Sequence, residues 1–134
     1  MPFSVIGYNF VSNRCKSKTG GGVGIYLQNG VEYKLLGECK FSDPDVIESL
    51  FLEIMVSHGK NIVGCVYRPP NQNTAMFIDK FNNILSLISK DNKHCYVMGD
   101  FNQDLLQYNH QVPTQEFIDS LSSHAFLPLI FNPT

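Results

Sequence analysis

The 134-residue sequence lacks an apolar run long enough to cross a membrane. Its first residues also lack the basic and apolar regions of a secretory signal peptide. No permitted N-glycosylation acceptor is present, because the only candidate triplet has proline after Asn132. These absences predict a nuclear or cytoplasmic protein that is not secreted and has no membrane partner.

The four cysteines lack the C-x-x-C spacing of zinc ribbons and redox motifs. Cys65 and Cys95 lie inside apolar runs, where a reduced cysteine behaves as a small core residue. The pattern therefore predicts buried free thiols in a reducing compartment rather than zinc ligands or disulfides. The four histidines show no metal-ligand spacing either, so the spacing of the residues themselves indicates no metal site.

The sequence has little net charge, −2, with ten Lys and Arg against twelve Asp and Glu. This balance gives no support to a protein that coats DNA with a basic surface. It does not exclude an enzyme that holds a metal and contacts a few phosphates. Hydrophobic residues make up 43% and charged residues 16% of the chain, which indicates one globular domain over residues 1–134.

In the first half of the chain, alternating apolar residues predict a strand at 23–28 and another at 31–36. Asn29-Gly30 between them predicts a hairpin, because both residue types accept positive φ. A further strand is predicted at 49–56.

In the second half, a nearly all-apolar run at 62–67 predicts a strand covered on both faces. A helix beginning at Asn73 or Thr74 follows, with one apolar stripe made of Phe77, Phe81, Ile84, Leu85 and Ile88. A second buried strand is predicted at 95–98, and a last strand at 126–131. Between them, a helix is predicted from an N-cap at Thr114 to about His124, with Phe117, Ile118 and Leu121 facing inward. The mixture predicts an α/β (α+β) layered sandwich.

The segment Gly99-Asp100-Phe101-Asn102 directly follows a predicted buried strand. In an extended segment, Asp100 and Asn102 would project the same way, beyond the strand end where open α/β folds place their sites. A carboxylate beside a carboxamide could serve a base or metal-bound water next to a phosphate. A simple turn is the competing interpretation, since Asp and Asn are common turn residues. Spacing alone leaves both open.

The segment Tyr67-Arg68-Pro69-Pro70-Asn71 follows the other predicted buried strand. A tyrosine hydroxyl at a strand end can donate to a phosphate oxygen, and the prolines fix the backbone. Without further information, a proline-rich strand exit with an exposed arginine is the simpler interpretation. The glycines at 20–24 do not form a phosphate loop, because no Lys-Ser/Thr follows and no helix begins there.

Several segments, in this order, resemble the endonuclease domain of non-LTR retrotransposons, the domain associated with reverse transcriptase. The matching segments are Gly-Gly-Gly-Val-Gly-Ile-Tyr, Glu-Ser-Leu-Phe, Val-Tyr-Arg-Pro-Pro-Asn, Met-Gly-Asp-Phe-Asn-Gln-Asp and Leu-Ile-Phe-Asn-Pro-Thr, at residues 20–26, 48–51, 66–71, 98–104 and 129–134. The family belongs to the endonuclease/exonuclease/phosphatase (DNase I-like) superfamily. The resemblance implies a four-layer α/β sandwich that uses Mg²⁺ to cleave phosphodiesters, with DNA as the partner.

By this resemblance, Asp100 would orient or activate the attacking water, Asn102 would help to position it, and Tyr67 would contact the scissile phosphate. Asn71 and Arg68 would bind the substrate. Glu48 matches a family position that is not the metal-binding glutamate.

The family's N-terminal asparagine and metal-binding glutamate, and its C-terminal Ser-Asp-His motif, have no match here. The resemblance therefore implies an incomplete DNase I-like fold, the central part of one domain, and an inactive fragment. A non-catalytic remnant or binding module, and a phosphatase of the same superfamily, are the alternatives. Because unpaired sheet edges promote association, self-association is also expected.

Overall fold

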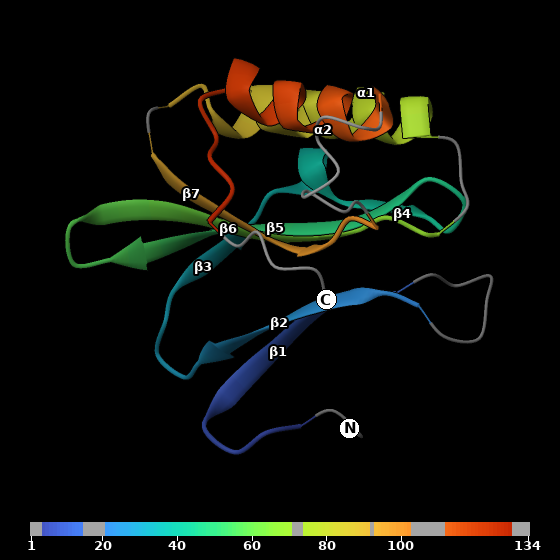
Figure 1. The fold of residues 1–134 in the computed structure, drawn as a ribbon. Helices are drawn as coiled ribbons and strands as arrows, with labels where there is room; N and C mark the ends of the chain where they lie inside the picture. Colours follow the sequence, from blue (N-terminus) through green and yellow to red (C-terminus); the bar gives the residue numbers. More distant parts are fainter. Residues whose placement is uncertain (1–3, 15–20, 71–73, 92, 103–111, 130–134) are drawn as a thin grey trace.

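The computed structural model describes residues 4–14, 21–70, 74–91, 93–102 and 112–129, which form three layers (Figure 1). β1 (Tyr8–Asn13) and β2 (Val23–Gln28) form a two-stranded antiparallel sheet. The larger sheet has the order β3-β5-β6-β7, with β4 also paired to β5. Its strands are β3 (Tyr33–Leu35), β4 (Phe41–Asp43), β5 (Ile47–Val56), β6 (Gly59–Tyr67) and β7 (His94–Asp100).

The helices α1 (Thr74–Ile88) and α2 (Val112–Ser123) cover one face of the larger sheet, and β1 and β2 lie on the other side (Figure 1). A short 3-10 helix, η1 (Gly37–Cys39), joins β3 to β4. Neither described helix combines the length and apolarity that a membrane span requires. The mixed α/β class expected from the sequence is confirmed.

β5 and β6 form an antiparallel hairpin, and β7 runs parallel to β6 after the α1 crossover. Side chains alternate along β5, so that Ile47 and Phe51 pack toward the helices while Leu50 and Leu52 pack toward β1 and β2. Both faces of β5 thus carry apolar side chains, because the helices cover one face and β1 and β2 cover the other.

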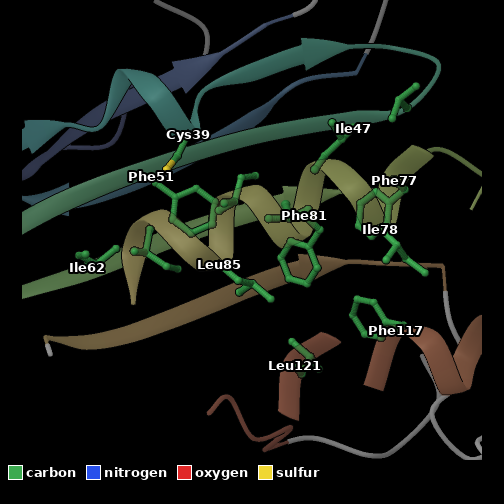
Figure 2. Packing of buried hydrophobic residues seen from close by; sticks show 14 residues of the cluster. Cys39, Ile47, Phe51, Ile62, Phe77, Ile78, Phe81, Leu85, Phe117 and Leu121 are labelled. Atoms are coloured by element: carbon green, nitrogen blue, oxygen red, sulfur yellow. The ribbon is translucent and has the colours of Figure 1, made fainter. Parts of the chain in front are cut away.

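The main core lies between the larger sheet and the helices (Figure 2). The predicted stripe on α1 is confirmed, since Phe77, Phe81, Ile84, Leu85 and Ile88 are all buried. Phe117 and Leu121 of α2 are buried beside them, as expected. Phenylalanines of α1 and α2 form one cluster with Phe101, which directly follows β7, and the ring centroids lie 5.7 Å apart for Phe81–Phe117 and 5.0 Å apart for Phe101–Phe117.

The predicted hairpin over residues 23–36 is wrong. The turn itself exists, because the Val31 amide donates to the Gln28 carbonyl at 3.2 Å and Gly30 has a φ of 92°. However, β2 pairs with β1, and β3 pairs with β5 in the other sheet. An Asn-Gly turn reverses the chain locally, but it does not decide which strand each arm pairs with.

Two expectations in the second half are also corrected. β7 is covered on one face only, and Tyr96 and Met98 on its other face are 49% and 55% exposed. The described part of the predicted last strand, residues 126–129, forms no strand, and residues 130 and 131 lie outside the described part of the chain. The second helix begins at Val112 rather than after an N-cap at Thr114.

Candidate functional site

Tyr67 and Asp100 occupy the last paired position of the parallel strands β6 and β7. Because both strands run in the same direction, this position lies at the carboxyl end of each. On β6, Val63 and Cys65 pack toward the two-stranded sheet, so Tyr67, two residues further, points to the same side. Paired residues share a face, which places Asp100 on that side as well. Tyr67 and Asp100 thus lie at strand ends, as the sequence indicates, and β6 and β7 bring these two ends side by side. Their catalytic roles stay predictions.

Glu48 extends this arrangement by one strand, because its register partner on β6 is Tyr67. Glu48, Tyr67 and Asp100 thus form a line across β5, β6 and β7, which we call the strand-end row. With strands about 4.8 Å apart, the two carboxylate-bearing residues are separated by roughly 10 Å between Cα atoms, with the tyrosine between them.

Glu48 is 3% exposed, although it lies on the same apolar face as Leu50 and Leu52. A carboxylate buried there needs hydrogen bonds, and Glu48 Oε2 accepts one of 2.8 Å from the Gly22 amide. Gly21 and Gly22 have φ angles of 82° and 104°, and a Cβ on Gly21 would lie 3.2 Å from Glu48 Oε1. Glu48 therefore fixes the glycine turn that precedes β2. In the sequence, the alternation that places Glu48 on the same strand face as Leu50 and Leu52 could have revealed this buried carboxylate.

Asn102 is placed differently from the sequence expectation. β7 ends at Asp100, and Asn102 has a φ of 50°, so the segment does not stay extended through both residues. The Asn102 backbone amide donates to Asp100 Oδ1 at 3.0 Å, and its side-chain Nδ2 donates to the Arg68 carbonyl. Asp favours such turns and Asn tolerates positive φ, so the loop turns back toward the end of β6. The assumption that the Asp100 and Asn102 side chains project in parallel is wrong.

Arg68 is buried beneath this loop. Its guanidinium donates to the Asn102 carbonyl at 3.0 Å and to Thr74 Oγ1 at 2.7 Å, and it lies 5.9 Å from the centre of the Phe77 ring. Burial lowers the pKa of Arg68, although an arginine keeps its charge in proteins. The Arg68 amide also donates to the Asp100 carbonyl at 2.8 Å. These contacts make Arg68 a support for the loop after β7, and its expected role in substrate binding stays a prediction.

Asn13 was not singled out in the sequence, yet it connects the two sheets near the strand-end row. Its side-chain Nδ2 donates to the carbonyls of Phe41 at 2.6 Å and Ser49 at 2.9 Å. It is buried at the end of β1, and it holds that end against β4 and β5. Nothing in the local sequence pattern distinguishes this asparagine from a turn residue.

The expected substrate-binding residue Asn71 lies outside the described residues. Within the described ranges, no three His, Cys, Asp or Glu side chains lie close enough together to hold a metal ion. In the strand-end row, Asp100 is the exposed carboxylate and Glu48 the buried one.

No protein-family model matches this chain, and a search of curated proteins finds no similar sequence.

Proposed function

We propose that the strand-end row is a phosphodiester site of the DNA endonuclease type, Mg²⁺-dependent and related to the nicking domains of non-LTR retrotransposons. The observation that supports this most strongly is the pairing of Tyr67 with Asp100 at the carboxyl ends of two parallel strands. These are the two residues for which the resemblance to that family implies contact with the phosphate and with the attacking water. They come from segments separated by the whole of α1.

In this proposal, the Tyr67 hydroxyl donates to a phosphate oxygen, and the Asp100 carboxylate orients a water for in-line attack. Asn102 helps through its backbone amide, which holds Asp100 Oδ1 at 3.0 Å and so limits rotation of the carboxylate. Glu48, the register partner of Tyr67, acts indirectly, because its bond to the Gly22 amide fixes the glycine segment that precedes β2.

The row fits a weakly held Mg²⁺. Mg²⁺ prefers carboxylate oxygens and is often held by one or two of them together with substrate phosphates. Asp100 supplies one exposed carboxylate, whereas Glu48 is buried and bonded to Gly22. When bound, the cation would neutralise charge that develops on the phosphate.

We expect this chain to nick DNA at a rate near background. Hydrolysis needs an activated water, a well-held cation and help for the leaving oxygen, and groups that act as a unit lose most of their effect when one is missing. A plasmid-nicking assay with Mg²⁺ would compare the chain with Asp100→Ala. Nicking well above background that disappears in Asp100→Ala would show a complete site and would contradict this expectation.

Mn²⁺ in place of Mg²⁺ tests the site itself, because it broadens the NMR signals of nearby amides. We expect broadening centred on residues 67–68 and 100–102 that is lost in Asp100→Asn. Asp119→Asn, on α2, removes an equal charge elsewhere and is the matched control. Broadening that is absent at these residues, or that persists in Asp100→Asn, would rule out a nuclease-type cation site.

A phosphate-binding module without catalysis is the second candidate. It is favoured by Asn102, because its side-chain Nδ2 donates to the Arg68 carbonyl instead of facing a catalytic water. This candidate would be favoured if a short DNA duplex binds more weakly to Tyr67→Phe than to the unaltered chain, and if Mn²⁺ causes no broadening at Asp100.

A further inference from the structure

A second polar site lies at the opposite end of the larger sheet. A cavity of about 600 Å³ is lined by Val56, His58, Lys60, Asn61, Lys93 and His94. These residues surround the turn between β5 and β6 and the start of β7, which lie together at one end of the sheet (Figure 1). Asn61 and His94 form the first pair of β6 and β7, six residues before the Tyr67–Asp100 pair, so roughly 20 Å of strand separates the two sites.

The lining is rich in hydrogen-bond donors. Five of its six residues have side-chain N–H groups, and none has a carboxylate. The side chains of His58, Asn61 and His94 form no hydrogen bond with any other residue in the described part of the chain. These donors are therefore available to a ligand that accepts hydrogen bonds.

Glu53 holds the two lysines of the cavity in place. Its carboxylate lies 2.6 Å from Lys93 Nζ and 3.4 Å from Lys60 Nζ, on a side chain only 13% exposed. The hydrogen bond between Glu53 and Lys93 lowers the pKa of Glu53 and raises that of Lys93, so both stay charged. An ammonium group has three donors, and Glu53 occupies one on each lysine. The exposed carboxylate of Asp91 lies 3.6 Å from Lys93 Nζ. Two carboxylates, Glu53 and Asp91, therefore balance the charges of the two lysines. The unused hydrogen-bond donors, rather than net charge, favour an anion.

We propose that this cavity binds a phosphate-type oxyanion, either free phosphate or a phosphate group of a nucleic acid. Tetrahedral oxyanions accept several hydrogen bonds at once and bind most strongly to charged donors. The cavity offers the donors that Glu53 leaves unused on its two lysines, together with the side chains of His58, Asn61 and His94. This inference does not depend on the strand-end row.

The test is an NMR titration of the full chain with inorganic phosphate, with sodium chloride at matched ionic strength as the reference. We expect saturable shifts of the amides of residues 56–61 and 93–95. Lys60→Gln should bind phosphate about tenfold more weakly, the change expected for one lost hydrogen bond to a charged group. Lys40→Gln, which removes an exposed lysine near β4, is the matched control and should bind as the unaltered chain does.

Two further experiments distinguish free phosphate from nucleic acid as the ligand, and this cavity from the strand-end row. A 5′-phosphorylated single-stranded oligonucleotide that shifts the same amides identifies nucleic acid as the source, whereas shifts with inorganic phosphate alone identify the free anion. Asp100→Asn should leave phosphate binding at this cavity unchanged, which separates this site from the strand-end row. Equal shifts in chloride, or unaltered affinity in Lys60→Gln, would overturn the proposal.

Discussion

At the scale of single residues, Arg68 and Gly99 decide where Asp100 lies. Arg68 bonds to the loop after β7 from below, through the Asn102 carbonyl and, by its own amide, the Asp100 carbonyl. Gly99 has a φ of +152°, and a Cβ there would overlap the backbone of Val66 on the neighbouring strand. Both residues therefore keep the ends of β6 and β7 close together.

Replacing Arg68 by methionine tests its structural role. Methionine keeps much of the apolar stem but removes every donor, so the Asn102 carbonyl and Thr74 hydroxyl lose their partner. We expect the free energy of unfolding to fall by about 2–3 kcal/mol, measured by urea denaturation, because hydrogen bonds from a charged group are lost at a buried position. The control, Lys40→Met at an exposed position, should change it by less than about 0.5 kcal/mol. An equally small effect in Arg68→Met would contradict the supporting role.

Gly99→Ala should both destabilise the chain and displace Asp100 from Tyr67. The added Cβ meets backbone rather than a flexible side chain, and the φ angle is one that other residues rarely adopt. We expect a loss of roughly 1–3 kcal/mol in unfolding free energy, with amide shifts at residues 66–68 and 100–102. Gly37→Ala is the control, since a Cβ there meets no atom within 4 Å. Matching thermal unfolding curves for the two variants would show that the close approach at Gly99 is not needed.

At the scale of elements, β5 organises the molecule because it is paired on both edges and covered on both faces. It pairs with β6 from Glu48 to Val56 and with β3 and β4 on the other edge. Its Glu53 bonds to Lys93, which immediately precedes β7, so that an ion pair connects β5 to the start of β7 across β6. The far end of the sheet is thus held by an ion pair in addition to the backbone pairing that joins the strands at both ends.

The Glu53 ion pair predicts a pH dependence of stability. The folded-state pKa of Glu53 is lowered below its ordinary value of 4.5, first by the hydrogen bond to Lys93. A lowered folded-state pKa stabilises the protein above the unfolded-state value, and that stability is lost as pH falls through the folded-state pKa. The difference in unfolding free energy between the unaltered chain and Glu53→Gln should therefore be largest above about pH 5 and shrink at lower pH.

Urea denaturation between pH 7 and pH 3 measures this difference. The matched control is Glu32→Gln, which removes an exposed carboxylate outside the ion pair. If the difference for Glu53→Gln stays constant over this range, the ion pair contributes nothing to stability.

At the scale of the whole molecule, the three layers leave one side of β7 poorly covered. β7 is the last strand in the order of the larger sheet, and its Tyr96 and Met98 face the side where β1 and β2 lie but remain exposed. Exposed strands with apolar side chains pair readily with other chains.

We therefore expect concentration-dependent self-association, measured by light scattering after size-exclusion chromatography. Met98→Lys should raise the monomer fraction, because charge on an exposed strand opposes edge-to-edge association. Met76→Lys, at a comparably exposed position on α1, is the control and should leave the distribution unchanged. A monodisperse monomer at every concentration would contradict this prediction.

The sequence by itself determined the elements whose patterns are local. The alternating residues of β2, the apolar run of β6 and the stripe of α1 each require only their own spacing, because an apolar face must be buried wherever the element packs. The positions of Tyr67 and Asp100 at strand ends followed from the same patterns.

Only the tertiary structure decided which strands pair with each other. Local patterns state which face is apolar but not which strand pairs with which, so the separation of β2 from β3 and the placement of Glu48 beside Tyr67 depend on long-range pairing. The turned Asn102 and the buried Arg68 arise for the same reason. Each satisfies a backbone carbonyl of the other's segment, 34 residues apart in the chain, and this requirement exists only once β6 and β7 lie side by side.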